Sequence, residues 1–414
     1  MSEPLVIVGN GMAAARFVDE LTKRAPGRYA IAVIGEEPAL AYNRVLLSSL
    51  LAGEVAEQEI ELKSRGWWES KGVTLVYGRR AIRVDARSRQ VHLKGGARLD
   101  FSKLVLATGS EPIRLPIPGA ELCGVMTFRD LQDVGAIMAR GGPEKRAVVI
   151  GGGLLGLEAA YGLRKAGAQV TVVHLMDRLM ERQLDACGGV MLKAALEAHS
   201  IEVLLEAESA AIEGHDKAEG LRLSDGRVLP ADLIVMAAGI RPRTELARMA
   251  ELEVKRGIVV GDQMQTSLPD IYALGECAEH RGLCYGLVEP AHEQARVLAL
   301  HLAGAAAAYE GSLLATNLKV SGVDVFSAGD FLGSPGTEPI LFTDPEHGIY
   351  RKLIVKETRL AGAVLLGDTA DSLWYLDLIR SGTSIAGMRD ALVFGRAFCG
   401  CVEDAAAMPQ AEAA

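Results

Sequence analysis

Residues 5–17 read LVIVGNGMAAARF, an apolar run followed by the pattern G-x-G-x-x-A. The run lacks helical periodicity, which predicts a buried parallel strand, and the glycines predict a tight turn into a helix. Gly9 permits the turn, Gly11 has no side chain to keep a pyrophosphate from the backbone, and Ala14 lets the helix pack closely on the strand. The N-terminus of that helix favours the negative charge of a phosphate.

A second apolar strand follows at the distance that a dinucleotide-binding unit requires. Residues 30–35 read AIAVIG and end at Glu36, whose carboxylate can accept hydrogen bonds from a ribose diol. A glycine pattern alone is weak evidence, but strand, pattern and terminal acid in register strongly predict a dinucleotide site.

Length and composition bound the protein class. A chain of 414 residues predicts two or three domains, and 49% hydrophobic with 23% charged residues is typical of a globular protein. The formal net charge of -9 argues against a nucleic-acid partner. The sequence shows no leader before Leu5 and no apolar run long enough to span a bilayer, so we expect a cytoplasmic protein without a membrane partner.

The cysteines follow no ligand or dithiol spacing. The six are Cys123, Cys187, Cys277, Cys284, Cys399 and Cys401. Without a C-x-x-C pair we expect free thiols in a reducing compartment and no metal site. A single residue separates the last two, which suits neither a relaxed disulfide nor an iron-sulfur site, and leaves an intermolecular role as a minor alternative.

The segment after Glu36 contains Arg44 and Ser48, which either reach a bound pyrophosphate or are a solvated arginine and a helix cap. Further on, three short runs separated by polar turns predict a small β-meander; they are residues 73–77, 81–84 and 90–93. A buried strand at 103–107 then meets Thr108-Gly109, where backbone amides would lie at the carboxyl edge of a parallel sheet.

Residues 146–160, RAVVIGGGLLGLEAA, repeat the pattern of strand, glycine turn and helix seen at residues 5–17, here with a full G-x-G-x-x-G. They therefore indicate a second nucleotide cofactor. The next strand, 169–173, ends at His174 rather than at an acid, so the choice between NADH and NADPH stays open. Arg178 and Arg182 could pair with a phosphate, although surface arginines are commoner than ligands.

The remaining motifs complete the two predicted nucleotide-binding regions and indicate a further C-terminal region. Residues 233–238 form an apolar strand that breaks at Gly239, and a strand at 271–274 ends in Gly275-Glu276, where amides and a carboxylate can hold a polyhydroxylated chain. The C-terminal part predicts a three-stranded sheet, at 316–320, 350–355 and 360–366, covered by helices that include an amphipathic stretch at 374–379.

The order of these motifs resembles that of the FAD-dependent pyridine-nucleotide disulfide oxidoreductase superfamily. Four segments are similar to the flavin module of NAD(P)H nitrite reductase large subunits: YNRVLLSS at 42–49, GGLLGLE at 152–158, LMERQLD at 179–185 and LLGDTAD at 365–371. The resemblance covers nearly the whole chain. It implies an α/β fold with two Rossmann-like dinucleotide-binding domains, arranged as in glutathione reductase, plus a C-terminal α+β domain.

The resemblance also implies domain boundaries. FAD would be bound by residues 1–117 and 241–310, NAD(P)H by residues 118–240, and residues 311–400 would form an interface domain. Residues 401–414 are rich in alanine and glutamate, and we expect this tail to be disordered.

Carried over position by position, the resemblance implies two sets of cofactor-binding residues. The FAD set is Gly9, Gly11, Met12, Ala13, Ala14, Glu36, Arg44, Ser48, Ala81, Thr108, Gly109, Gly275 and Glu276. The NAD(P)H set is Gly151, Gly153, Leu154, Leu155, Gly156, His174, Arg182 and Gly239. Glu158 would act catalytically where the nicotinamide meets the flavin, the alternative being an ordinary acid near a helix start.

This sequence differs from members of the superfamily in two ways that limit the reactions we expect it to catalyse. Members that reduce disulfides carry cysteine where this chain has residues 43–51, and no cysteine precedes Cys123, so disulfide, peroxide and persulfide chemistry are disfavoured. Full-length nitrite reductase large subunits continue into cluster and sirohaem regions, so this sequence is expected not to reduce nitrite alone.

The resemblance therefore predicts an FAD-dependent NAD(P)H oxidoreductase that passes electrons to a separate iron-sulfur, sirohaem or molybdenum redox protein. The favoured role is the flavoprotein subunit of an assimilatory nitrite or nitrate reductase system, and the resemblance also implies a homodimer. The alternatives are a rubredoxin or ferredoxin reductase of another pathway, such as an oxygenase system, and an NAD(P)H-binding redox-sensing protein.

Overall fold

A computed structural model describes residues 2–320 and 322–399, and the chain divides into two compact units. Unit 1 comprises Met1–Arg114, Thr127–Ile137 and Ala238–Ser312, and unit 2 comprises the segments between them and the chain from Leu313 onward. The domain boundaries expected from the sequence stay predictions. The expected disordered tail at 401–414, which includes Cys401, lies outside the described residues.

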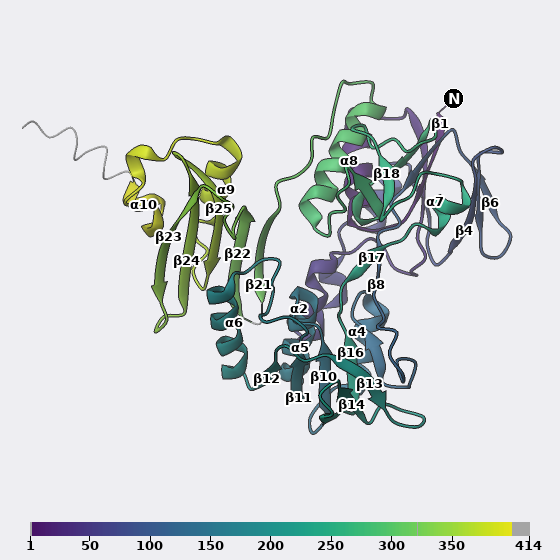
Figure 1. Ribbon diagram of the computed structural model, residues 1–414. Coiled ribbons are helices and arrows are strands. Elements are labelled where there is room, and N and C mark those ends of the chain that lie inside the picture. The colour runs from purple at the N-terminus through teal and green to yellow at the C-terminus, as the bar shows by residue number, and fades with distance from the viewer. Residues whose placement is uncertain (1, 321, 400–414) are drawn as a thin grey trace, which may run out of the picture. The chain divides into compact units, whose positions relative to one another are not determined.

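The core of unit 1 is a five-stranded parallel sheet in the order β19-β7-β1-β2-β3, of which Figure 1 labels β1. Its strands are β1 (Glu3–Val8), β2 (Tyr29–Ile34), β3 (Thr74–Val76), β7 (Lys103–Leu106) and β19 (Ile271–Ala273). Leu5 and Ile7 of β1 are fully buried, which explains why this strand has an apolar run and no alternation. Helices α1 (Met12–Arg24) and α8 (Val288–Leu302) pack against each other beside this sheet.

The predicted meander is correct only in part. An antiparallel three-stranded sheet contains β4 (Ala81–Asp85), β5 (Gln90–Leu93) and β6 (Arg98–Asp100). The prediction that residues 73–77 join it is wrong, because Thr74–Val76 pairs in parallel with β2 and extends the main sheet. A short apolar run next to polar turns looks the same in either sheet, and only the long-range pairing distinguishes them.

Unit 2 contains a second five-stranded sheet, in the order β12-β11-β10-β16-β9. Its strands are β9 (Val125–Thr127), β10 (Arg146–Ile150), β11 (Gln169–Val173), β12 (Ile201–Leu204) and β16 (Leu233–Met236). The helices α5 (Leu154–Lys165) and α6 (Ala186–Ala198) follow β10 and β11 in the chain, as a parallel crossover requires. A small antiparallel sheet of β13 (Ser209–Glu213), β14 (Gly220–Leu223) and β15 (Val228–Pro230) completes this part.

The C-terminal part of unit 2 is an antiparallel sheet of five strands, so the predicted three-stranded sheet is wrong in its strand number. The order is β21-β22-β25-β24-β23, formed by β21 (Ala315–Val320), β22 (Val323–Gly329), β23 (Thr337–Asp344), β24 (Ile349–Lys356) and β25 (Arg359–Leu366). Edge strand β23 was missed because it contains Pro339 and exposes half of its positions. The predicted helix is confirmed as α9 (Ser372–Ser381), whose Tyr375 is fully buried.

The shorter elements link these sheets. They are α2 (Leu47–Leu51), α3 (Arg65–Ser70), α4 (Leu131–Arg140), α7 (Glu245–Met249), α10 (Arg396–Cys399), β8 (Ser110–Pro112), β17 (Ile240–Pro242), β18 (Ile258–Val260) and β20 (Ala278–His280). The 3-10 helices found among residues 2–320 and 322–399 are η1 (Arg44–Leu46), η2 (Glu57–Ile60), η3 (Gly275–Cys277), η4 (Ala386–Met388) and η5 (Leu392–Phe394). Within the described ranges, no helix combines the length and apolar character needed to cross a bilayer.

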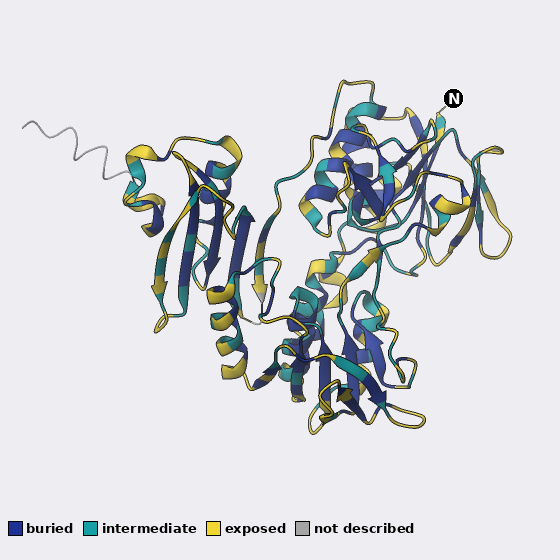
Figure 2. Ribbon diagram, viewed as in Figure 1, coloured by how far each residue is buried: buried dark blue, intermediate teal, exposed yellow. Residues whose placement is uncertain are grey.

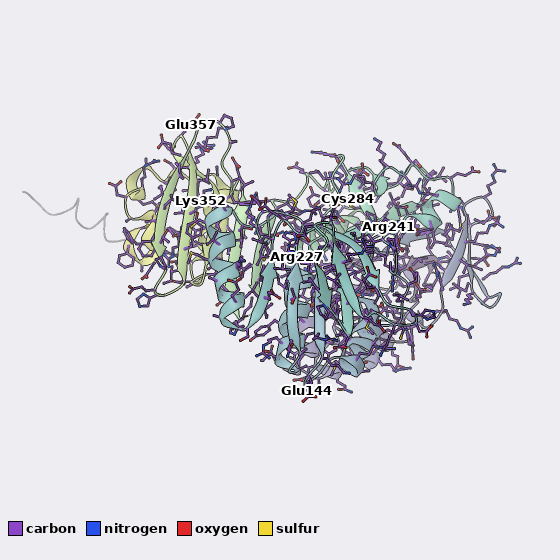
Figure 3. The ribbon with its side chains drawn as sticks, turned by 60° about the horizontal axis from the view of Figure 1, so that its bottom comes forward. Glu144, Arg227, Arg241, Cys284, Lys352 and Glu357 are labelled. Atoms are coloured by element: carbon purple, nitrogen blue, oxygen red, sulfur yellow. The ribbon has the colours of Figure 1, made fainter. Side chains whose placement is uncertain are left out.

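Within unit 2, the C-terminal sheet is tied to the start of α6. Asp185 caps that helix by accepting from the backbone N–H of Gly188 at 3.1 Å. The same carboxylate accepts from the Tyr350 hydroxyl at 2.7 Å and from Lys352 Nζ at 3.0 Å, both on β24 (Figure 3 labels Lys352). The outer face of α6 is exposed whereas its Leu192 and Leu196 are buried (Figure 2), so its inner face packs into the unit.

Two glycines allow helix and strand to approach closely at the nucleotide turns. Gly9 has a φ of +118°, and a Cβ there would lie 2.0 Å from the carbonyl oxygen of Ala107. A Cβ on Gly156 would lie 2.0 Å from the carbonyl oxygen of Gly151. Because backbone cannot yield as a flexible side chain does, no larger residue fits at either position without moving an element.

Replacing Gly156 by alanine is therefore expected to push α5 away from β10 and to lower the free energy of unfolding by about 1–3 kcal/mol. Urea unfolding followed by circular dichroism measures the change. Gly153→Ala is the matched control in the same turn, because no described atom lies within 4 Å of a Cβ built there. Equal urea midpoints for the two variants would contradict the packing argument.

Candidate functional site

The first glycine turn lies at the carboxyl edge of the parallel sheet of unit 1. The backbone N–H of Gly9 donates to the carbonyl of Ile34 at 2.8 Å, and the N–H of Ala107 donates to Val8 at 2.8 Å. The turn thus sits between the ends of β2 and β7, where the chain order reverses and ligands of such sheets bind.

The start of α1 has the donors that a pyrophosphate needs. Gly11 is the N-cap and gives no side-chain cap, so the first N–H groups, from Met12 onward, have no intrahelical acceptor. A Cβ on Gly11 would meet no described atom within 4 Å, which means that the backbone faces open space. Ala14 is fully buried against the sheet, and Ala13 lies 3.1 Å from the position of a Cβ on Gly275. We call the glycine turn and the uncapped start of α1 the first cradle, and its free N–H groups and open space fit FAD.

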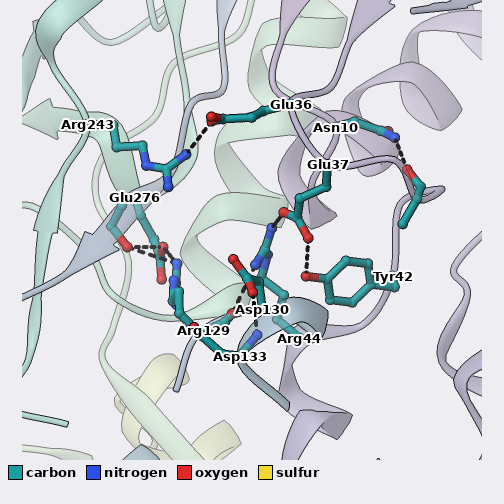
Figure 4. A network of polar contacts seen from close by, with 12 residues as sticks. Asn10, Glu36, Glu37, Tyr42, Arg44, Arg129, Asp130, Asp133, Arg243 and Glu276 are labelled. Carbon is teal, nitrogen blue, oxygen red and sulfur yellow. Dashed lines mark hydrogen bonds and ion pairs between the residues drawn. The ribbon is translucent and has the colours of Figure 1, made fainter. Parts of the chain in front are cut away.

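Glu36 follows β2 and keeps an accessible carboxylate at the same edge. Its side chain is 47% exposed and faces Arg243 at 3.3 Å and Arg80 at 3.6 Å (Figure 4 shows the Arg243 contact). Thr108 donates its hydroxyl to the carbonyl oxygen of Arg243 at 2.9 Å, which brings the Thr108-Gly109 turn to the same place. An acid with free acceptor positions here suits a ribose diol.

The Gly275-Glu276 turn joins the Thr108-Gly109 turn through a polar cluster. Ser110 donates to Glu276 at 2.7 Å, and Arg129 donates to Ser110 at 2.8 Å and pairs with Glu276 (Figure 4). The backbone N–H of Gly275 donates to Oε1 of Gln294 at 2.8 Å. The structure therefore brings together Thr108, Gly109, Gly275 and Glu276, as expected, but the sequence analysis missed Ser110, Arg129, Arg243 and Gln294.

Arg44 is held by other residues of unit 1 rather than simply solvated, and its contact with a bound pyrophosphate stays a prediction. It pairs with Glu37 and donates to the carbonyl of Arg129 at 3.0 Å, while the Tyr42 hydroxyl donates to Glu37 at 2.6 Å (Figure 4). Burial raises the pKa of the Tyr42 hydroxyl, so this hydroxyl remains a donor. Arg44 therefore fastens the segment after β2 to the segment that begins at Thr127.

The surroundings of the other two residues predicted to contact FAD in this region, Ser48 and Ala81, do not indicate a ligand. Ser48 is half-buried on α2, and its hydroxyl makes only a long contact of 3.5 Å with the Val45 carbonyl. It does not cap α2, whose N-cap is Leu46. Ala81 is buried at the start of β4. Their roles stay predictions.

The segment that begins at Thr127 also carries a perturbed acid. Burial, followed by the nearby charge of Asp130, raises the pKa of Asp133 to about 6. The Thr127 hydroxyl contacts this carboxyl at 3.1 Å, and the N–H of Asp133 donates to Asp130 at 2.9 Å. Asp130 thus satisfies a free donor at the start of α4.

The second glycine turn repeats the cradle in unit 2. Gly151 donates its N–H to Val173 at 2.9 Å, and Gly153 is the N-cap of α5 without a side-chain cap. Leu154 and Leu155 follow as the first residues of the helix, with N–H groups free for a second pyrophosphate. Glu158 lies on the same helix and is 8% exposed.

The other three residues expected to bind NAD(P)H, which are His174, Arg182 and Gly239, have distinct surroundings. His174 is buried, its Nδ1 accepting from the N–H of Gly152 at 3.0 Å, with Nε2 at 3.2 Å from Oε2 of Glu181. Arg182 is exposed and makes no polar contact with the rest of the described chain. Gly239 lies in unit 1, where its carbonyl accepts from the N–H of Ile113 at 2.9 Å. Their roles as ligands of NAD(P)H stay predictions.

Comparison with known proteins gives the family. The model of the pyridine nucleotide-disulphide oxidoreductase family matches residues 3–296. The chain belongs to this family. A second model, the rubredoxin NAD+ reductase C-terminal domain, matches residues 315–383 and accounts for the C-terminal sheet.

Two relatives come from Bacillus subtilis. The chain is 46% identical over 383 residues to a nitrite reductase [NAD(P)H], covering 92% of this chain and 48% of the relative. It is 44% identical over 374 residues to an assimilatory nitrate reductase electron transfer subunit, covering 90% of this chain and 48% of the relative. The chain thus spans about half the length of these curated relatives.

Solved structures confirm the fold. A ferredoxin reductase from Rhodopseudomonas palustris superposes with a TM-score of 0.84 at 26% identity, over 95% of this chain and all of that chain. An NADH:rubredoxin oxidoreductase from Clostridium acetobutylicum superposes with a TM-score of 0.76 at 27% identity, over 93% of this chain and 97% of that one. The family and both cradles together identify an FAD-dependent NAD(P)H oxidoreductase, as the sequence predicted.

The two cradles predict opposite phenotypes for matched valine substitutions at Gly11 and Gly153. Neither position has a described atom within 4 Å of a built Cβ, so both variants should fold. Gly11→Val is expected to lose bound FAD, because its side chain fills the space of the first pyrophosphate. Gly153→Val is expected to keep FAD but to lose affinity for NAD(P)H. Flavin content and coenzyme binding by calorimetry measure both, and the reverse pattern would exchange the two assignments.

Proposed function

We propose that this chain takes electrons from NAD(P)H through FAD and delivers them to a separate iron-sulfur, sirohaem or molybdenum redox protein of nitrite or nitrate assimilation. The observation that carries the proposal is the 44% identity, over 90% of this chain, to a relative named as an electron transfer subunit. The 46% identity to a nitrite reductase supports the same pathway.

The thiols of unit 1 support a protein acceptor rather than a disulfide. Its only cysteines are Cys277 and Cys284. Cys277 is fully buried, contacts the carbonyls of Leu106 and Leu274, and has its pKa raised by burial. Burial also raises the pKa of Cys284. A protonated thiol is a poor nucleophile, so neither residue suits dithiol exchange.

The residues of the chain would supply binding and orientation. When bound, FAD accepts a hydride from NAD(P)H and can release its electrons one at a time. The first turns of α1 and α5 would hold the two pyrophosphates with backbone N–H groups. Glu36 would bind a ribose diol, and Glu276, oriented by Ser110 and Arg129, would hold the hydroxylated chain of the flavin. Glu158 would line the place where the nicotinamide is positioned.

A second candidate is a rubredoxin or ferredoxin reductase of another pathway. It is favoured by the match of residues 315–383 to the C-terminal domain of rubredoxin NAD+ reductases and by the superposition on an NADH:rubredoxin oxidoreductase. The hydride-accepting half of the reaction would be the same, and only the docked acceptor would differ.

We also propose a cytoplasmic location and a homodimer. Five cysteines of the described part are free thiols, which suits a reducing compartment. Size-exclusion chromatography with light scattering tests the dimer.

Steady-state assays with NADH test the function. We expect the holoprotein to reduce an iron-sulfur protein or rubredoxin rapidly and to reduce glutathione disulfide or an aromatic disulfide hardly at all. Cys284→Ser should keep kcat for the protein acceptor within about twofold. Reconstitution with a sirohaem nitrite reductase polypeptide separates the two candidates, because only the assimilatory system predicts NADH-dependent loss of nitrite. Disulfide reduction that disappears in Cys284→Ser would contradict the proposal.

A further inference from the structure

We propose that Glu181, positioned by His174, selects the coenzyme that lacks a 2'-phosphate, so that NADH is preferred to NADPH. The inference rests on the proposed oxidation of NAD(P)H. It starts from the end of strand β11, where many dinucleotide-binding units have an acidic residue and this chain has none. In a dinucleotide-binding unit a carboxylate at this strand end accepts from the ribose diol and repels a 2'-phosphate. Here the strand is followed by His174.

The imidazole of His174 connects the nucleotide turn to the carboxylate of Glu181. Its Nδ1 accepts from the backbone N–H of Gly152 at 3.0 Å, so this nitrogen carries no proton. The ring is therefore neutral, with its proton on Nε2, which donates to Oε2 of Glu181 at 3.2 Å. A neutral ring orients the Glu181 carboxylate without cancelling its charge.

The chain around Glu181 is fixed against the nucleotide turn. The N–H of Met180 donates to the carbonyl of Gly152 at 3.0 Å. A Cβ on Gly152 would lie 2.6 Å from Leu179 and 2.7 Å from the His174 ring, so both side chains pack directly on the turn. A few residues later Asp185 caps α6 and pairs with Lys352. Anchored on both sides, Glu181 places a carboxylate with a 25% exposed side chain beside the turn.

The nearby arginines do not form a phosphate site. The guanidinium of Arg178 is bound by Asp177 at 2.8 Å and by the carbonyl of Leu184 at 3.3 Å. Arg182 is exposed and has no residue of the described chain to orient it. A 2'-phosphate would thus meet one loose cation and the oriented charge of Glu181.

Binding of ADP-ribose and of its 2'-phosphate to the FAD-loaded protein tests the inference by calorimetry, without any electron transfer. A carboxylate about 6 Å from a phosphate costs roughly tenfold in affinity per unit charge at an intermediate dielectric. We therefore expect the wild type to bind ADP-ribose at least about tenfold more tightly than its 2'-phosphate.

Glu181→Gln removes the charge and is expected to reduce that ratio to about threefold or less, mainly by tightening the 2'-phosphate. The matched control is Glu197→Gln on the last turn of α6, an acid that is 46% exposed and paired with Lys193, and its ratio should equal that of the wild type. The corresponding KM ratio for NADH and NADPH should move in parallel.

Equal affinities in the wild type, or a ratio that Glu181→Gln leaves unchanged, would overturn the inference. A wild type that prefers the 2'-phosphate and loses this preference in Arg182→Ala would also overturn it, and would assign Arg182 as the phosphate ligand. Selective binding of ADP-ribose without reduction of the flavin by NADH would instead refute the proposed function and leave the selectivity of the site intact.

Discussion

The close approach of backbone to backbone at Gly9 and Gly156 is the constraint on which both nucleotide sites depend. At each position a Cβ would lie 2.0 Å from a carbonyl oxygen, so strand, turn and helix are packed as tightly as peptide groups allow. This packing leaves the uncapped starts of α1 and α5 facing open space at Gly11 and Gly153. The fold therefore creates two sets of free N–H donors, and the charge of a pyrophosphate is what such donors attract.

Around the first cradle, polar side chains from distant segments join the loops at the sheet edge. Arg243 faces Glu36, Arg129 orients Glu276, and Arg44 ties the segment after β2 to the one that begins at Thr127. Each arginine neutralises an acid or satisfies a carbonyl, which lets partly buried charges persist. In unit 2 the ring of His174 links the turn at Gly152 to Glu181, and we propose that this carboxylate stands in for the strand-end acid.

The sequence predicted what is local and missed what is assembled over long distances. Glycine spacing and apolar runs located β1, β2, β10, β11 and both helix starts, because each is encoded within about 15 residues. Arg129, Gln294 and Arg243 belong to no local pattern, and they reach the site only through folding of the whole unit. The same limit explains why β3 was assigned to the wrong sheet, because its pairing with β2 cannot be seen in a short stretch of sequence. Edge strand β23 was not predicted because Pro339 and the exposed positions hide the alternation of apolar and polar residues.

Anaerobic mixing of the FAD-loaded protein with NADH, followed through the flavin absorbance in a stopped-flow instrument, tests the central claim most directly. We expect the flavin to bleach in one turnover and to recover its absorbance when an oxidised iron-sulfur protein is added. Bound FAD that neither NADH nor NADPH bleaches would contradict it, because the second cradle would then bind a ligand that does not reduce the flavin.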